Sequence, residues 1–392
     1  MARRVLLLVA DSVGCGALPD AAGTVDEGAN TLANTARAVG GLHLPALGSL
    51  GLGHVTGILG VPPAPHPRGF HGVAWPRSPG KDTISGHWEM MGLVLEAPLR
   101  TFPTGFPPEL CEEFLRESGA PGLLGNEVAS GTEIISRLGA EQQRTGWPIV
   151  YTSADSVFQV AAHEQAVPLA TLLDWCRAAR RVADRWRVAR VIARPFTGEP
   201  GSYRRTWNRK DFAIEAPGRT VLEDLAAAGV PVVGVGKISD IFDGRGLTEA
   251  VHTEGNADGL ARTEALLGRI DRGLVFVNLV DFDMLHGHRN DPAGYARALE
   301  ALDAFLPRLM ERLGPEDLLL ITADHGCDPT TPSTDHSREQ VPVLAWRRGA
   351  GGGSLGTRDS FADVGATVAE WLGVGSRCGE SFAKLLAPPP GG

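Results

Sequence analysis

Three short runs of apolar residues occur along the chain, and an acidic residue follows each run. The runs and their acids are residues 4–10 with Asp11, 274–280 with Asp283, and 318–322 with Asp324. Continuous apolar runs of this length are typical of strands that are buried on both faces of a parallel sheet. Because ligands bind beyond the carboxyl ends of such strands, we expect the three acids to lie on one edge.

The middle of the chain has a different pattern, with amphipathic segments and few apolar runs. We predict helices over residues 108–117, 132–138 and 168–185, and strands over 149–152 and 188–193. A proline cluster over residues 102–108 precedes this part, and Pro217-Gly218 follows it. The pattern therefore predicts a small α/β cap domain, residues 100–217, inserted into a discontinuous core of residues 1–99 and 218–392.

The two ends of the chain alternate helical and strand-like segments, which indicates an α/β fold with a mostly parallel sheet flanked by helices. Helices are predicted over residues 31–39 and 220–228, and a strand over 230–235. A further helix should begin at Asp291-Pro292, an acidic cap followed by proline, and Pro307 should kink it. The tail, residues 388–392, is expected to be disordered.

Composition narrows the choice of partners and compartment. The chain has 392 residues, with 21% charged and 43% hydrophobic residues, which are ordinary values for a globular protein. A formal net charge of −9 gives no electrostatic support for a nucleic-acid partner. Five cysteines without a regular spacing favour reduced thiols and a cytoplasmic location. The first apolar run is too short for an export signal or a membrane span.

Six acids and histidines form the candidate chemical centre: Asp11, Asp283, His288, Asp324, His325 and His336. A single Asp at the end of a strand usually caps a helix or forms a turn, and a single His is usually an ordinary polar side chain. The combination is more informative, because acids follow three strands and histidines stand close to two of these acids. We therefore predict a centre that binds two divalent metal ions.

Residues 80–89 contain the candidate nucleophiles, Thr83 and Ser85. Coordination to a metal ion is an established way to activate a hydroxyl group, which is otherwise a weak nucleophile. The competing interpretation is a helix start, because Asp, Thr, Ser and Gly all favour caps and turns. The stretch by itself does not decide between these two interpretations.

Several motifs resemble the phosphopentomutase family of the alkaline phosphatase superfamily. The resemblance rests on residues 81–89, on the spacing of Asp283 and His288, and on residues 322–326 and 334–336. Residues 10–14, 125–135, 192–196 and 236–241 are also similar, and the similarity extends to about residue 371. Since it includes cap segments as well as metal ligands, it is specific to this family within the superfamily.

The resemblance implies a role for each candidate residue. Thr83 would accept the phosphoryl group, one Mn²⁺ would be held by Asp11, Asp324 and His325, and a second by Asp283, His288 and His336. Asp155, Arg194, Arg209 and Lys237 would bind the substrate. His286 would be a bystander. Cys327 stands where relatives commonly have Asn, and two interpretations remain open there: a further metal ligand and, as we expect, a spectator thiol.

The implied reaction interconverts ribose 1-phosphate and ribose 5-phosphate, and the 2-deoxyribose pair, with a sugar bisphosphate as primer. Three alternatives remain open: a metal-dependent phosphohydrolase on the same scaffold, a cofactor-independent phosphoglycerate mutase, and an inactive metal-binding scaffold. Phosphoglycerate mutases of that kind typically use Ser and have longer chains. A scaffold protein should lack some ligand or the nucleophile, whereas all seven residues are present here.

Overall fold

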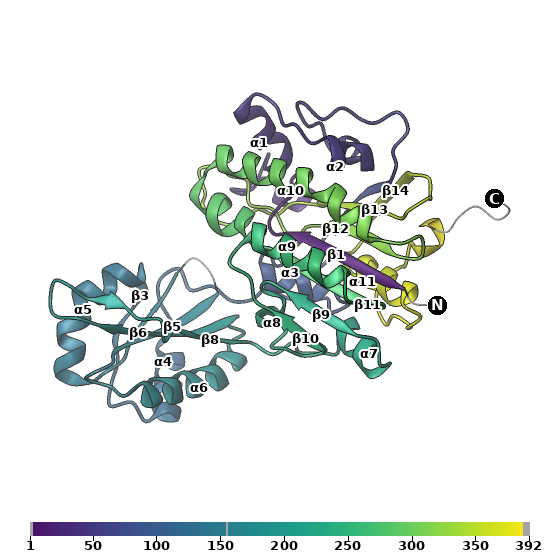
Figure 1. Ribbon diagram of the computed structural model, residues 1–392. Coiled ribbons are helices and arrows are strands. Elements are labelled where there is room, and N and C mark those ends of the chain that lie inside the picture. Colours follow the sequence, from purple (N-terminus) through teal and green to yellow (C-terminus); the bar gives the residue numbers. More distant parts are fainter. Residues whose placement is uncertain (1–2, 154–155, 387–392) are drawn as a thin grey trace. The chain divides into compact units, whose positions relative to one another are not determined.

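The computed structural model describes residues 3–153 and 156–386. Asp155 and the tail, residues 388–392, lie outside the described residues. The chain divides into two compact units, which are described separately (Figure 1). The larger unit contains Met1–Pro98 and Ala216–Gly392, and the smaller unit contains Leu99–Glu215.

An eight-stranded sheet is the centre of the larger unit. Its strands, in spatial order, are β10 (Glu249–Val251), β9 (Val232–Val235), β11 (Gly273–Leu279), β1 (Arg4–Ala10), β12 (Leu318–Thr322), β13 (Val341–Trp346), β2 (Phe70–Ala74) and β14 (Gly353–Arg358). The first five are mutually parallel, while β13 runs antiparallel to both of its neighbours. The predicted mostly parallel sheet is confirmed, and the three apolar runs are its adjacent strands β11, β1 and β12.

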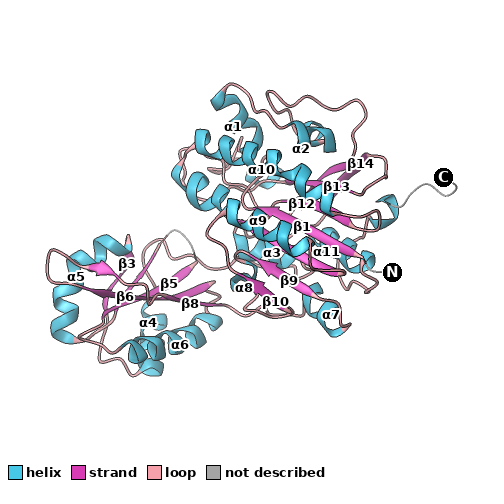
Figure 2. Ribbon diagram, viewed as in Figure 1, coloured by secondary structure: helices cyan, strands magenta, loops and turns pink. Residues whose placement is uncertain are grey.

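Helices lie on both sides of this sheet (Figure 2). They are α1 (Thr31–Val39), α2 (Pro45–Leu50), α3 (Thr83–Met90), α7 (Val221–Ala227), α8 (Ile238–Ile241), α9 (Asn256–Leu267), α10 (Pro292–Arg312) and α11 (Ala362–Trp371). Short turns of other helix types are η1 (Pro19–Ala21), η2 (Leu52–His54), η3 (Phe282–His286), η4 (Gly287–Arg289) and η5 (Ala383–Leu386). Of these, η3 is a π-helix, and only Val280 and Asp281 separate it from β11. The α/β class predicted from the sequence is therefore confirmed.

Helix α10 begins as the sequence indicates. The side chain of Asp291 accepts a hydrogen bond from Gly294 N, and Pro292 occupies the first helical position. Its leucine stripe is buried and comprises Leu299, Leu302, Leu306 and Leu309. The helix continues through Pro307 to Arg312, so this proline does not end it.

The smaller unit is a sheet with helices on both faces. Its strands, in order, are β3 (Leu124–Val128), β4 (Ile149–Thr152), β5 (Val157–His163), β6 (Arg190–Thr197) and β7 (Arg204–Arg205), while β8 (Lys210–Ala213) also pairs with β6. Helices α4 (Pro108–Ser118) and α6 (Leu169–Arg185) share one apolar cluster with Val150 and Phe158. Helix α5 (Gly131–Thr145) packs on Ile149 and Tyr151. Because neighbouring strand residues point to opposite faces, these two clusters cover the two sides of the sheet.

Some element boundaries differ from the sequence expectation. The helix predicted over residues 132–138 continues to Thr145, and the strand predicted over 188–193 is β6, Arg190–Thr197. The extra helical residues of α5 are mostly polar, which is why hydrophobic periodicity stopped short of them. Among the described residues, no helix has the length and apolar character needed to cross a membrane.

Candidate metal centre

Asp11 follows strand β1 and is fully buried. Its Oδ2 accepts a hydrogen bond from Asn278 Nδ2 at 2.9 Å and lies 3.5 Å from Lys237 Nζ. Its Oδ1 has no hydrogen-bond partner in the described part of the chain. Burial raises the pKa of Asp11, but Lys237 and His325 outweigh this effect and lower the pKa to about 2. Asp11 is therefore a buried carboxylate with one oxygen held and one oxygen free.

Asp324 and His325 follow strand β12 and are also buried. Asp324 Oδ1 accepts a hydrogen bond from Ser12 N at 3.0 Å. Its Oδ2 makes no hydrogen bond among the described residues, but it lies 3.1 Å from His87 Nδ1. His325 Nδ1 lies 3.0 Å from Gly326 O. Because a carbonyl can only accept, Nδ1 has the hydrogen and Nε2 faces the two carboxylates.

The position of His325 Nε2 indicates a site for a cation. This nitrogen lies 3.4 Å from Asp11 Oδ1 and 3.4 Å from Asp324 Oδ2. A lone pair directed at two carboxylates is repulsive unless a proton or a metal ion lies between them. Burial lowers the pKa of His325, but the Asp324 and Asp11 carboxylates raise it well above its usual value. The surroundings thus favour positive charge at this point.

Asp283 has a similar arrangement on the π-helix η3. Its Oδ2 lies 3.3 Å from His288 Nε2, and its Oδ1 lies 3.4 Å from His336 Nε2. His288 Nδ1 donates to Thr334 O at 2.7 Å, which again directs Nε2 toward the carboxylate. Asp283 Oδ1 and His336 Nε2 have no hydrogen-bond partner within the described ranges, although both residues are buried. Buried polar atoms without a partner are costly unless a ligand satisfies them.

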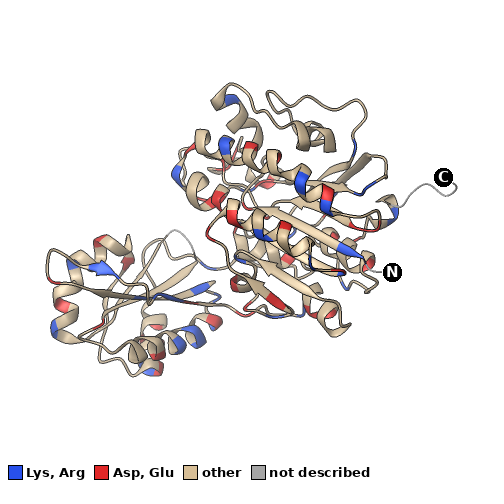
Figure 3. Ribbon diagram, in the orientation of Figure 1, with Lys and Arg blue, Asp and Glu red and all other residues tan. Residues whose placement is uncertain are grey.

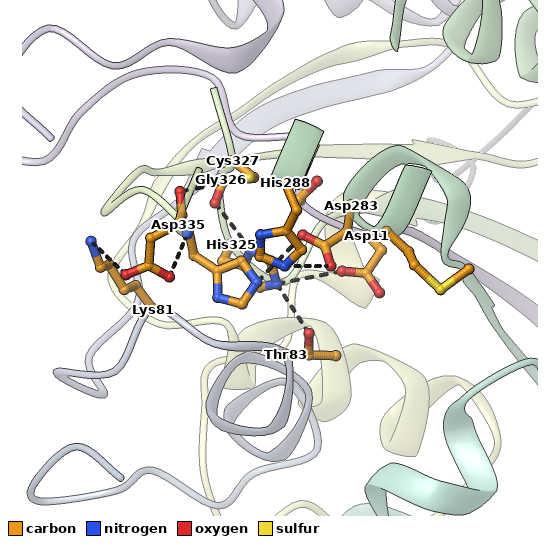
Figure 4. Close-up of polar contacts among 12 residues, drawn as sticks. Asp11, Lys81, Thr83, Asp283, His288, His325, Gly326, Cys327 and Asp335 are labelled. Carbon is orange, nitrogen blue, oxygen red and sulfur yellow. Dashed lines mark hydrogen bonds and ion pairs between the residues drawn. The ribbon is translucent and has the colours of Figure 1, made fainter. Parts of the chain in front are cut away.

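The donor atoms form three groups whose members lie within 4.8 Å of one another (Figure 4). The groups are Asp11 with Asp324 and His325, Asp283 with His325 and His336, and Asp283 with His288 and Cys327. Oxygen and nitrogen donors of this kind suit a divalent metal ion. The unpartnered buried atoms and the donor set therefore both fit a divalent metal centre, to which all six predicted ligands contribute.

Thr83 lies beside this centre at the first position of α3. Its Oγ1 is 3.2 Å from His325 Nε2 (Figure 4). Ser85 is buried, and its Oγ donates to Asp82 Oδ2 at 2.7 Å, while Asp82 caps the helix through Ser85 N. Both interpretations of residues 80–89 therefore apply, since the helix start is also what presents the Thr83 hydroxyl to the centre.

Three further buried residues, His87, Asn278 and Glu339, form hydrogen bonds near the centre and were not recognised in the sequence. His87 Nδ1 donates to Thr83 O at 2.9 Å, and Asn278 Nδ2 lies 3.4 Å from His87 Nε2. Buried Glu339 accepts hydrogen bonds from Thr31 N, Thr31 Oγ1 and Ser337 Oγ at 2.9, 2.7 and 2.7 Å. The signal for Asn278 was a single polar residue within an apolar run. Glu339 had no local signal, because its partners are distant in sequence.

His286 and Cys327 both lie close in sequence to proposed ligands, but only Cys327 belongs to a metal-binding group among the described residues. His286 Nδ1 lies 3.0 Å from Asp291 Oδ2, and His286 is in none of the metal-binding groups found among the described residues. Cys327, in contrast, shares a group with Asp283 and His288. The spectator role expected from the sequence stays a prediction, and the position of Cys327 also suits a metal ligand.

The smaller unit contains a group of arginines around Tyr151. The pKa of Tyr151 is raised by burial, while Arg194, Arg205 and Arg209 act to lower it. The buried Tyr151 hydroxyl has no hydrogen-bond partner in the described ranges. Arg194 Nε donates to Gln159 Oε1 at 3.1 Å, and Arg209 Nη2 contacts Asp211 at 2.6 Å. This group combines positive charge with an unsatisfied hydroxyl, which is suitable for an anion.

Other arginines of the smaller unit are less suitable for a ligand. Figure 3 shows basic residues along α6, and several of these pair with acids. Arg180 Nε lies 2.9 Å from Asp184, and Arg185 Nη2 lies 2.8 Å from Glu113. The Tyr151 group is thus the stronger anion candidate in this unit.

Comparison with known proteins supplies the family. Residues 3–376 match the model of the Metalloenzyme superfamily. The chain is 71% identical to a phosphopentomutase from Anaeromyxobacter sp. (strain K), over 97% of this chain and 98% of that protein. It is 57% identical to a phosphopentomutase from Symbiobacterium thermophilum, over 98% of each chain. A solved structure of Leishmania mexicana phosphoglycerate mutase at low cobalt concentration covers 99% of this chain and 97% of its own, with 12% identity and a TM-score of 0.49.

Proposed function

The chain belongs to the phosphopentomutase family, a family of isomerases, and we propose that it works through a phosphorylated Thr83. The substrates would be ribose 1-phosphate and ribose 5-phosphate, together with the 2-deoxyribose pair. The observation that carries the proposal is the 3.2 Å distance between Thr83 Oγ1 and His325 Nε2. It is supported by the hydrogen bonds that occupy the other candidate, Ser85.

We assign the metal ligands to two sites. Asp11, Asp324 and His325 would hold one ion, and Asp283, His288 and His336 would hold the other. Mixed carboxylate and imidazole donors suit Mn²⁺. Bound ions would lower the pKa of the Thr83 hydroxyl and neutralise charge on the phosphoryl oxygens. Asp11 Oδ1, Asp283 Oδ1 and His336 Nε2 make no hydrogen bond among the described residues, and this supports the assignment.

The chain's own residues would act in two transfers. In the first, a free hydroxyl of the pentose monophosphate attacks phospho-Thr83, the Thr83 Oγ–P bond breaks, and a pentose bisphosphate forms with loss of the hydroxyl proton. In the second, Thr83 Oγ takes the other phosphoryl group, and that sugar oxygen regains a proton. A sugar bisphosphate would prime the enzyme by phosphorylating Thr83. The Asp82 cap and the His87 contact would hold the Thr83 backbone during both transfers.

Substrate contacts are assigned to Arg194, Arg209, Lys237 and Asp155. Arg194 and Arg209 suit a phosphate group, because a guanidinium matches its oxygens with two hydrogen bonds. The unsatisfied Tyr151 hydroxyl beside Arg194 supports a phosphate in the smaller unit. Lys237, 3.5 Å from Asp11, supports a second charge contact in the larger unit. Residues 100–217 would then serve as a cap that binds substrate and excludes water from the phosphoenzyme.

We also propose that the enzyme acts in the cytoplasm. Cys15, Cys111, Cys176, Cys327 and Cys378 are all free thiols. Such thiols persist in a reducing compartment, whereas secreted proteins of this kind tend to form disulfides.

One assay tests the proposed reaction. The protein would be incubated with ribose 5-phosphate or deoxyribose 5-phosphate, Mn²⁺ and a priming bisphosphate, and the products would be separated. We expect isomerised sugar 1-phosphate with little free phosphate. Release of inorganic phosphate in place of the isomer would instead identify a phosphohydrolase that uses the same centre.

A further inference from the structure

The thiol of Cys327 lies among the ligands of the Asp283 site, which the assignment above leaves with three protein donors. Cys327 Sγ, His288 Nε2 and a carboxylate oxygen of Asp283 all lie within 4.8 Å of one another. We propose that Cys327 is a fourth ligand at this site, and that its thiolate makes the site prefer Zn²⁺ or Co²⁺ over Mn²⁺. This inference rests on the proposed two-metal centre.

The fold fixes the thiol against the segment that supplies the other ligands. Cys327 is buried, and its backbone N donates to Ser12 O at 3.1 Å and to Thr31 Oγ1 at 3.2 Å. A Cβ atom on Gly287 would lie only 2.8 Å from Cys327 Sγ. Gly287 stands between Asp283 and His288 in sequence, so the absence of a side chain there allows this segment to approach the thiol.

The interactions of the sulfur within the described residues include His288, itself a proposed ligand, and Asp335. Cys327 Sγ has a contact with Asp335 O at 3.7 Å, and a thiol is a weak hydrogen-bond donor. Asp283 Oδ1 and His336 Nε2, which lie 3.4 Å apart, make no hydrogen bond within the described residues, and both residues are more than nine-tenths buried. These unpartnered atoms indicate a metal site independently of Cys327.

The resulting donor set differs from that of the other site. Asp283, His288, His336 and Cys327 would offer one oxygen, two nitrogens and one sulfur, and four donors of these kinds are typical of zinc. Thiolate is a soft ligand, whereas Mn²⁺ prefers carboxylate and water. Asp11, Asp324 and His325 include no sulfur. The two sites should therefore differ in metal preference within one chain.

Cobalt spectroscopy tests the thiolate directly. Metal-free protein would be loaded with Co²⁺, bound cobalt measured by elemental analysis, and the near-ultraviolet spectrum recorded. We expect two cobalt ions per chain and a thiolate-to-cobalt charge-transfer band in the parent. The matched control Cys378→Ser removes a thiol of the same unit outside the ligand groups and should keep the band, whereas Cys327→Ser should lose it. In competition experiments, Cys327→Ser should lose about tenfold or more of the Zn²⁺ over Mn²⁺ preference at one site.

The outcomes separate the two proposals. Two bound cobalt ions without the band, or a band that persists in Cys327→Ser, would overturn the ligand role of Cys327 and leave the two-metal centre intact. Failure to bind cobalt would contradict the metal centre itself. If Cys327→Ser does not fold, zinc X-ray absorption of the parent decides, with a sulfur neighbour at about 2.3 Å expected. Nitrogen and oxygen neighbours alone would overturn the proposal.

Discussion

The ligand sets of the two proposed metal sites are built differently. The strand-end group, Asp11, Asp324 and His325, lies directly at the ends of the adjacent parallel strands β1 and β12. The segment group, Asp283, His288 and His336, uses the π-helix η3, the turn η4 and a loop. The His288 side chain is 30% exposed, whereas the His325 side chain is 2% exposed. The two groups thus have similar donor atoms, but they differ in the backbone elements that hold these donors and in how far their histidines are exposed.

This difference indicates a division of roles. Each carboxylate of the strand-end group has one oxygen held by a neighbouring donor, Asn278 Nδ2 for Asp11 and Ser12 N for Asp324. Under the proposed function, ligands fixed in this way would hold the Thr83 nucleophile and its phosphoryl group in one geometry. The segment group has a more exposed histidine and a nearby thiol. Under the proposed assignment, metal preference would therefore vary at the segment group, whose His288 and Cys327 form no hydrogen bond with Thr83 among the described residues.

The largest expected effect is at Thr83, which contacts the strand-end group. Thr83→Ala removes the hydroxyl that would accept phosphate, so turnover should fall by about four orders of magnitude or more, and no phosphoenzyme should form. The measurements are the isomerase assay and mass spectrometry after incubation with a sugar bisphosphate. Ser85→Ala is the matched control and should still become phosphorylated, with a stability loss of about 1 kcal/mol from the lost bond to Asp82. Normal activity of Thr83→Ala would overturn the assignment.

Two histidine variants test which histidine belongs to the segment group. His288→Ala removes a proposed ligand, so we expect the affinity for one metal ion to fall by about 100-fold or more, since even loss of a supporting residue costs about 10- to 100-fold. His286→Ala removes a residue that pairs with Asp291 and should change metal affinity little. Titration of both variants with Mn²⁺, with bound metal measured at equilibrium, compares them. Equal losses would show that the segment group is wrongly assigned.

Asn278 tests the support of the strand-end group. Its Nδ2 holds Asp11 Oδ2 and lies near His87, so it links a proposed ligand to the helix of Thr83. Asn278→Leu keeps a similar size but removes the donor, and we expect metal affinity and kcat/KM to fall by about 10- to 100-fold. Asn278→Asp should not restore function, because it places a second carboxylate beside Asp11. An unchanged metal affinity in Asn278→Leu would show that Asp11 needs no such support.

The sequence predicted the residues of the strand-end group, but it did not predict the residues that form hydrogen bonds around this group. Residues 4–10 and 318–322 are apolar throughout, and a buried strand leaves few other interpretations for such runs. Strand β13 was not among the predicted strands, and it contains Pro342, a residue that is unusual inside a sheet. The bonds of Glu339 to Thr31 and of Asn278 to Asp11 join residues more than 250 positions apart. Local periodicity has no information about such contacts, which is why these residues were missed.

The smallest expected effect concerns how closely α3 approaches the strand-end group. A Cβ atom on Gly86 would lie 2.1 Å from Asp324 O, which is backbone and cannot move aside easily. Replacing a helical Gly with Ala normally stabilises a protein by up to about 1 kcal/mol. Gly259 in α9 has only ordinary contacts for an added Cβ, the nearest at 3.5 Å, so Gly259→Ala should show this gain in urea unfolding. Gly86→Ala should instead destabilise the protein by about 1–3 kcal/mol and lower turnover, because α3 and Thr83 must shift away from His325. A gain in stability for both variants would show that α3 does not need this close contact to position the nucleophile.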